Sequence, residues 1–304
     1  MSNFVVITEV GPRDGLQNER AVVPTDAKLS FIQRLEDAGV KHIEVASFVN
    51  PELVPAMADA EEVFRGLPDG DGKLRIALVP NERGLERALQ TNCKAIALFT
   101  AASDGFARAN INMTVKGSLD VFRDLASRAR GRGILVRGYV STIFECPYDG
   151  PVDPDRVREV AQAMLDMGCY EVSLGDTTGV GTPTHTRKLL DVILKSIDPD
   201  KVAMHFHDTW GMAVANAITA LSLGIRRFDS SAGGLGGCPF AKTASGNLAT
   251  EDLLYALEHL GFDTGVSLTQ VAAAAEELAA HLQRPLPSRV HQALIAKREA
   301  DLSC

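Results

Sequence analysis

The chain has 304 residues, 45% of them hydrophobic and 23% charged, and its formal net charge at pH 7 is −8. This length suits one α/β barrel, and the negative charge argues against a nucleic-acid partner, although a local arginine can still bind a small anionic substrate. No apolar run reaches membrane-spanning length and no secretory signal opens the chain, while five widely spaced cysteines without a CxxC pair indicate a reduced, cytoplasmic protein.

Short β-branched or apolar runs alternate with amphipathic stretches rich in Ala, Leu, Glu and Arg. The runs predict eight strands, at 4–10, 42–47, 74–80, 95–100, 134–141, 170–176, 202–207 and 226–231. Helices are predicted between them, including 25–39 and 153–168. These two begin at a cap-like Thr25 or Asp153 and end at a glycine.

Eight strands that alternate with helices predict an α/β protein with a (β/α)8 TIM barrel. An open doubly wound sheet is the alternative, but it carries a phosphate-binding glycine turn after its first strand, where this chain has "GPRDG". Without a linker, residues 1–304 are predicted to form a single catalytic domain. The barrel takes up about 1–265, and a C-terminal helical extension takes up about 266–304, with a helix at 267–282 and a tail that covers one end or mediates assembly.

Polar residues of unusual type follow five of the predicted strands. Barrel enzymes carry their chemistry at the carboxyl ends of the strands, so this gathering predicts an active site at that end. A chance distribution would scatter such groups over both ends. The residues are Arg13, Asp14, Glu44, Ser47, Asp176, His205, His207, Asp208, Cys238 and Asn247.

The stretch "HFHDTWG" contains His205 and His207, which a strand would point to the same face. With Asp14 and Asn247 they make a mixed oxygen and imidazole set that suits Mg²⁺ or Mn²⁺, whereas a structural zinc site usually includes cysteine. Each residue also has a plainer interpretation. Asp14 can be a turn former in "PRDG", Asn247 can cap a helix before "LATEDLLYALEHL", and the histidines can be solvated or hydrogen-bonded in the core.

Cys238 lies in the glycine-dense loop "SAGGLGGCPF". Such a loop can move and can bring its backbone close to a ligand, and a thiol at its tip can act as an acid or a nucleophile. The plainer alternative is a buried, inert cysteine. That interpretation is kept for the other four, Cys93, Cys146, Cys169 and Cys304.

Three segments resemble the 3-hydroxy-3-methylglutaryl-CoA (HMG-CoA) lyase family: "EVGPRDGLQNE", "HFHDTWGMAVAN" and "AGGLGGCPFAKTASGNLATEDLLYALEHLG". The resemblance runs from about Val5 to about Leu282, and its specific part is the cysteine loop, which related isopropylmalate-synthase-like enzymes lack. Two departures are Trp210, where the family often has Tyr, and Arg20, where it often has Lys. A tryptophan at the lip of the site is expected to alter the size of the pocket.

The resemblance implies a carbon–carbon lyase that cleaves HMG-CoA into acetyl-CoA and acetoacetate, a reaction of leucine degradation and ketone-body formation. It implies that an acyl-CoA is the small-molecule partner and that Mg²⁺ or Mn²⁺ is the cofactor. The implied metal ligands are Asp14, His205, His207 and Asn247, with Glu251 behind them. The implied catalytic groups are Arg13, Asp14, His205, Cys238, Glu44 and Asp176, and the implied substrate contacts are Arg13, Gln17, Ser47 and Asn110.

In the implied reaction Asp14 or His205 takes the proton of the 3-hydroxyl group, Arg13 stabilises the thioester enolate, and Cys238 protonates it. Two alternatives use the same barrel: a Claisen-type acyl-CoA condensing enzyme, and a lyase for a different 3-hydroxy-3-alkylglutaryl-CoA. A non-catalytic binding protein would be expected to lack a ligand or Arg13, and none is missing. We also expect a homodimer or a higher homo-oligomer.

Overall fold

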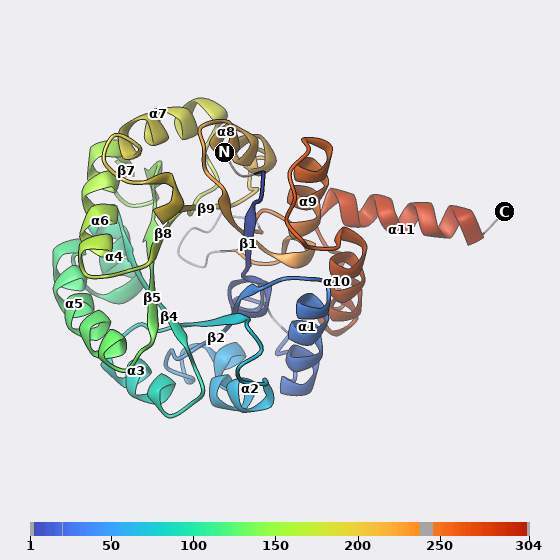
Figure 1. Ribbon diagram of the computed structural model, residues 1–304, viewed down its shortest axis with the longest axis horizontal. Coiled ribbons are helices and arrows are strands. Elements are labelled where there is room, and N and C mark those ends of the chain that lie inside the picture. The colour runs from blue at the N-terminus through green and yellow to red at the C-terminus, as the bar shows by residue number, and fades with distance from the viewer. Residues whose placement is uncertain (1–2, 20, 238–245, 303–304) are drawn as a thin grey trace.

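The computed structural model describes residues 3–19, 21–237 and 246–302 (Figure 1). Eight parallel strands form a closed barrel in the order β1-β10-β9-β8-β5-β4-β3-β2, which confirms the predicted (β/α)8 fold. Among the described residues, no helix is both long and apolar enough to cross a membrane. The barrel strands are β1 (Val6–Glu9), β2 (His42–Ser47), β3 (Leu74–Leu78), β4 (Ala95–Ala101), β5 (Leu135–Ser141), β8 (Glu171–Asp176), β9 (Val202–Phe206) and β10 (Arg227–Ser230).

All eight predicted strands are present, and most are shorter than predicted by one or two residues at an end. The residues that leave the strands include Val10, Pro80 and His207, which begin the loops at the carboxyl end of the barrel. A small antiparallel hairpin, β6 (Glu145–Cys146) with β7 (Gly150–Pro151), was not predicted, because two-residue strands are too short to show a period.

Helices surround the barrel, as Figure 1 shows, and α11 extends away from it. The helices are α1 (Thr25–Asp37), α2 (Ala60–Gly66), α3 (Glu82–Leu89), α4 (Asp104–Ile111), α5 (Val115–Gly131), α6 (Pro154–Asp166), α7 (Pro183–Ile193), α8 (Ala213–Ser222), α9 (Thr250–His259), α10 (Leu268–Leu282) and α11 (Arg289–Leu302). Four short helical turns join them: η1 (Gly11–Gly15), η2 (Pro55–Met57), η3 (Pro199–Lys201) and η4 (Ala232–Gly234).

The helix ends explain one correct and one wrong prediction. Asp153 caps α6, because its side chain accepts a hydrogen bond from the amide of Asp155. Thr25 does not cap α1: the cap residue is Pro24, and the Thr25 hydroxyl donates to Asp59 instead, at 2.8 Å. Proline fixes the φ angle before the helix, and the side chain of Asp26 accepts a hydrogen bond from the amide of Ala27 at 2.9 Å.

The inside of the barrel has an apolar half and a charged half. Ile76 and Leu78 of β3 pack with Ala95 and Ala97 of β4 and with the ring of Tyr139. Other strands, including the neighbours β2 and β5, carry Arg, Asp, Glu and His side chains that point to the same interior, described with the site below. Since a barrel interior of this size is filled by side chains, the two halves meet directly.

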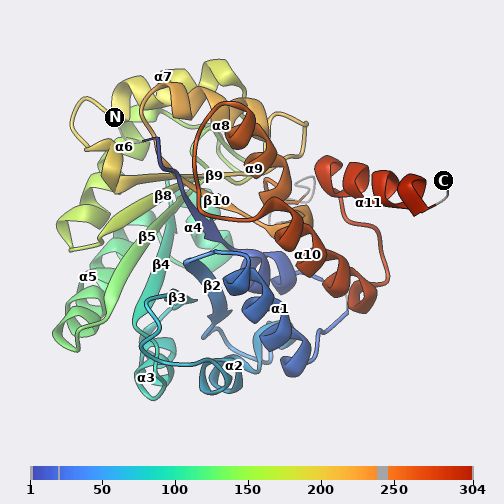
Figure 2. The ribbon, with the colours of Figure 1, turned by 45° about the vertical axis from the view of Figure 1, so that its right-hand side comes forward.

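The segment between α10 and α11 runs along the right-hand edge of the molecule in Figure 2, outside the ring of barrel strands. Leu286 packs over Gly233 of η4, where an added Cβ atom would lie 2.8 Å from the Leu286 Cδ1 atom. The amide of Ser288 donates to the carbonyl of Gly233 at 3.2 Å, and Arg284 forms an ion pair with Glu19. This segment therefore fixes the turn that follows β10.

Two glycines at helix ends allow a matched test of the packing. Gly39 and Gly224 have φ angles of 100° and 99°, so alanine is strained equally at both. A Cβ atom on Gly39 would lie 2.1 Å from the carbonyl oxygen of Gly265, whereas at Gly224 it would meet nothing within 4 Å. Gly224→Ala should cost about 1 kcal/mol of unfolding free energy, and Gly39→Ala roughly 1–3 kcal/mol more. Equal losses in urea unfolding would contradict this account of the contact with Gly265.

Candidate active site

The turn after β1 places Arg13 and Asp14 at the mouth of the barrel. The residues "GPRDG" form one wide helical turn, η1, rather than a simple reverse turn. Its start is fixed by Glu9, whose Oε1 atom accepts hydrogen bonds from the amides of Gly11, at 2.7 Å, and Ala232, at 2.9 Å. Burial raises the pKa of Glu9 to about 7. This carboxyl group therefore connects the loop after the first strand to the loop after the last one.

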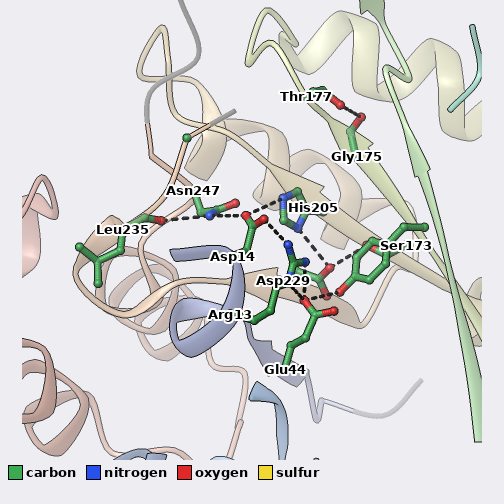
Figure 3. Close-up of polar contacts among 12 residues, drawn as sticks. Arg13, Asp14, Glu44, Ser173, Gly175, Thr177, His205, Asp229, Leu235 and Asn247 are labelled. Atoms are coloured by element: carbon green, nitrogen blue, oxygen red, sulfur yellow. Dashed lines mark hydrogen bonds and ion pairs between the residues drawn. The ribbon is translucent and has the colours of Figure 1, made fainter. Parts of the chain in front are cut away.

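Asp14, His205 and His207 form a cluster in which one possible ligand atom from each residue lies within 4.8 Å of the others. His205 belongs to β9 and His207 follows it, with the two ring centroids 5.3 Å apart. The structure thus brings together the three residues that the sequence placed at one site, and Figure 3 shows two of them, Asp14 and His205.

Asn247 completes the predicted ligand set. Its Nδ2 atom donates to Asp14 Oδ2 at 2.8 Å and to the Leu235 carbonyl at 3.0 Å, while its Oδ1 atom is buried without a hydrogen-bond partner (Figure 3). Ala249 is the cap residue of α9, so the alternative interpretation of Asn247 as a helix cap is wrong. A buried amide oxygen without a donor is the group that a cation would satisfy.

The pKa shifts of His207 and Asp14 suit cation binding, whereas the shift of His205 favours its protonated ring. Burial lowers the pKa of His207 to about 4, so its ring is neutral at pH 7 and keeps a lone pair for a ligand bond. Burial would raise the pKa of Asp14, but Arg13 and the two histidines outweigh it and lower the pKa, which keeps the carboxylate ionised. Burial also opposes a charge on His205, but Asp229 and Asp14 outweigh burial and raise its pKa. Neutral imidazole, carboxylate and amide oxygen together fit a divalent ion with open positions.

Arg13 is held by two carboxylates. Its Nε and Nη2 atoms donate to Glu44 Oε2, at 2.8 and 2.5 Å, and its Nη1 atom donates to Asp14 Oδ1 at 2.5 Å. Glu44 is fully buried beneath it, and Tyr139 donates a long hydrogen bond, 3.4 Å, to the same Glu44 oxygen. The guanidinium group thus has a fixed orientation beside the metal cluster.

A buried ion pair on the far side of His205 was not predicted from the sequence. Asp229 of β10 accepts two hydrogen bonds from Arg137 of β5, and its Oδ2 atom lies 3.2 Å from His205 Nδ1. Arg137 also donates to Glu171 and to the hydroxyl of Tyr139. Arg137 lies well before the carboxyl end of β5, whereas Asp229 lies next to the last residue of β10, level with His205.

A pocket of about 960 Å³ opens beside the cluster. One side of it is lined by Arg13, Asp14, His205 and His207. Two of the predicted substrate contacts, Gln17 and Asn110, also line it. Other residues around it are asparagines (Asn18, Asn50, Asn81, Asn112) and apolar side chains (Val22, Leu53, Val54, Leu78, Phe99, Phe106, Ile111, Met113).

Ser47 and Trp210 were expected at the pocket but lie outside its lining. Ser47 is completely buried, with its hydroxyl 3.5 Å from the carbonyl of Leu78, so it supports the wall instead of facing the pocket. Trp210 is 68% exposed and does not line the pocket, contrary to the expectation that it alters the pocket size. Arg20 lies outside the described residues.

Asp176 and Glu251 are buried supports for loops. Asp176 accepts a hydrogen bond from the amide of Gly181 at 2.9 Å, and burial raises its pKa to about 7. Glu251 accepts from the amide of Gly233 with both oxygens, at 2.9 and 2.8 Å, and burial raises its pKa to about 8. Gly234, the next residue of η4, packs next to Asn247. Glu251 therefore supports the position of Asn247 indirectly, by holding η4 in place.

Cys238 lies outside the described residues, and the preceding Gly237 lines the pocket. Cys93, Cys146 and Cys169 are free and buried, as expected. Burial raises the pKa of Cys93 and of Cys169 to about 12, so neither thiol is reactive at neutral pH.

A parallel barrel with a candidate metal cluster and a fixed arginine at its carboxyl end has the architecture of a barrel enzyme. The HMGL-like family model matches residues 5–278, and the chain belongs to this family. A hydroxymethylglutaryl-CoA lyase of Pseudomonas mevalonii is 47% identical over 96% of this chain and 97% of its own length.

Solved structures agree with this family. The hydroxymethylglutaryl-CoA lyase of Pseudomonas aeruginosa has a TM-score of 0.95 and 46% identity, covering 98% of this chain and 99% of its own. An HMG-CoA lyase of Acinetobacter baumannii, solved with coenzyme A and 3-methylmalate, has a TM-score of 0.92 and 36% identity, covering 96% of both chains.

The cluster can be tested by direct metal titration. His207→Ala removes one of few protein ligands, so Mn²⁺ affinity measured by calorimetry should fall at least about tenfold. His281→Ala, at an exposed position of α10, is the matched control and should bind as the unaltered protein does. Unchanged affinity in the His207 variant would remove this residue from the site.

Proposed function

We propose that the chain is an HMG-CoA lyase that cleaves HMG-CoA into acetyl-CoA and acetoacetate. The observation that carries this proposal is a fixed guanidinium group, Arg13, next to the Asp14, His205 and His207 cluster at the edge of a large pocket. The relatives are lyases, so the condensing alternative is not favoured. The coenzyme A in the Acinetobacter structure supports an acyl-CoA as the substrate class.

The cofactor we infer is Mg²⁺ or Mn²⁺, held by Asp14, His205, His207 and Asn247. When bound, such an ion supplies Lewis-acid activation of the substrate hydroxyl group. The donor set supports this assignment because its two imidazoles, its carboxylate and its unpartnered Asn247 Oδ1 atom are oxygen and nitrogen ligands without a thiolate among them.

The reaction is a retro-Claisen cleavage. Asp14 takes the proton from the 3-hydroxyl group, and the electron pair left on that oxygen forms the C=O bond of acetoacetate as the C2–C3 bond breaks. The electrons of that bond pass into the thioester, which becomes the enolate of acetyl-CoA. Arg13 stabilises the enolate oxygen by charge and hydrogen bonding, and an acid returns one proton to C2.

The chain's own residues orient these steps. Glu44 fixes the Arg13 side chain from below, so little reorganisation is needed when the enolate charge develops. Gln17 and Asn110 line the pocket as candidate contacts to the acyl-CoA. We assign the final proton transfer to Cys238, which follows Gly237 in the glycine-dense sequence "SAGGLGGCPF".

The decisive experiment incubates the purified protein with HMG-CoA and Mg²⁺ and measures acetoacetate. Exhaustive chelation should abolish turnover, and adding Mg²⁺ or Mn²⁺ should restore it. An absence of acetoacetate with metal present would overturn the proposed reaction, and full turnover in chelated protein would overturn the proposed cofactor.

Arg13 can be tested for its role in the chemical step. Arg13→Met should lower kcat on the order of 10³-fold, by comparison with the loss of an oxyanion donor. Because this change leaves the Glu44 carboxylate buried without its partner, a double variant with Glu44→Gln serves as a folding control. Arg13→Lys should rescue only in part, since the forked geometry is lost. A lysine variant with a near-normal kcat would show that a diffuse positive charge is sufficient.

Cys238 is tested by comparing it with a buried cysteine. Cys238→Ala should lower kcat about 10²–10⁴-fold, the usual contribution of a general acid, with little change in melting temperature. Cys169→Ala should show the opposite pattern, a loss of stability of about 1 kcal/mol from a small cavity and a normal kcat. A normal kcat in the Cys238 variant would leave the proton donor unassigned.

A further inference from the structure

Asp229 lies inside the barrel, on the opposite side of His205 from the candidate metal position. It is 1% exposed, and its Oδ2 atom is 3.2 Å from His205 Nδ1 (Figure 3). The other ring nitrogen, His205 Nε2, lies 4.0 Å from Asp14 Oδ2, within the cluster. The imidazole therefore stands between two carboxylates, one inside the cluster and one behind it.

The surroundings of Asp229 make it an acceptor. Its Oδ1 atom accepts from Arg137 Nη2 at 2.6 Å, and its Oδ2 atom accepts from Arg137 Nη1 at 3.2 Å and from the Ser173 hydroxyl at 2.7 Å. A carboxylate with these donors has no proton to give to His205. A hydrogen bond between them consequently requires the proton on Nδ1, and this leaves the lone pair on Nε2.

We propose that Asp229 is a positioning residue that keeps the His205 proton on Nδ1 and thereby directs the Nε2 lone pair toward the cation. The proposal rests on the metal site described under the proposed function. A carboxylate behind a ligating histidine also fixes the ring orientation and raises its basicity as a ligand. Arg137 is the fixed counter-charge that keeps Asp229 ionised in a dry interior.

A purely structural role for Asp229 makes a different prediction. If Asp229 served only to neutralise Arg137, then removing the charge of the other carboxylate that pairs with Arg137 would have the same effect as removing the charge of Asp229. Glu171 is that carboxylate: its Oε1 atom accepts from Arg137 Nε at 2.6 Å. Glu171 forms ion pairs with Arg137 and Arg227. His205 instead lies beside Asp14 and Asp229. Glu171→Gln is therefore the matched control.

Asp229→Asn keeps the shape and changes the hydrogen bonding. The amide oxygen is drawn to Arg137 at the Oδ1 position, so the amide NH₂ group occupies the Oδ2 position and faces His205. The histidine must then accept at Nδ1, and its proton moves to Nε2, where it blocks the ligand bond. The same tautomer error occurs when the aspartate of a serine-protease triad becomes asparagine.

The experiment measures Mn²⁺ affinity without substrate for the unaltered protein, Asp229→Asn and Glu171→Gln. Asp229→Asn should bind Mn²⁺ about 10–100-fold more weakly, the usual effect of removing such a partner, and Glu171→Gln should bind normally. Equal affinity in the unaltered protein and Asp229→Asn, or equal weakening in both variants, would overturn the proposal. An unaltered protein that binds no Mn²⁺ would instead overturn the metal site itself.

A second measurement determines the tautomer of His205 in the unaltered protein itself. ¹⁵N-labelled histidine in the unaltered protein, loaded with Mg²⁺, should show for His205 a protonated Nδ1 atom and an unprotonated Nε2 atom by NMR. His205→Gln identifies the signal. The opposite tautomer would overturn the proposal.

Discussion

The pairing of β1 with β10 is the contact on which both the barrel and the site depend. Val6 pairs with Arg227 and Glu9 with Ser230, so the first strand of the barrel lies beside the last one. Through this closure Asp14, which follows β1, reaches Asn247, which is 233 residues away in the chain. The residues of the cluster come from both sides of the β1–β10 pairing, so they meet only when the barrel is closed.

Charge inside the barrel is tolerated because every charged group has fixed partners. Burying an unpaired ion costs several kcal/mol, and removing one partner of a buried pair is strongly destabilising. Arg137 meets Asp229 and Glu171, and Arg13 meets Glu44 and Asp14. Tyr139 joins the two groups, with its ring in the apolar half of the interior and its hydroxyl in the charged half.

The strands were predictable because each is a compact β-branched or apolar run, and the cluster was predictable because strand ends carry barrel chemistry. Asp229 and Arg137 were not, because a polar residue within a strand has the same local pattern whether it faces inward or outward. Only closure decides which face is buried. Thr25 was mistaken for a cap because the fixed φ angle of Pro24 was not considered. The contact of Leu286 with Gly233 could not be predicted, because Leu286 lies in an extended segment whose sequence shows no hydrophobic period.

That extended segment also sets an order for biosynthesis. A ribosome makes the chain from its amino end, so Asp14, His205, His207 and Asn247 all emerge before Leu286 and Ser288. A nascent barrel can pair β1 with β10 and bring the residues of the cluster together while the turn at Gly233 still lacks its cover. The contacts that cover this turn therefore form last, and until residues 286–288 have been made the turn beside Asn247 lacks them.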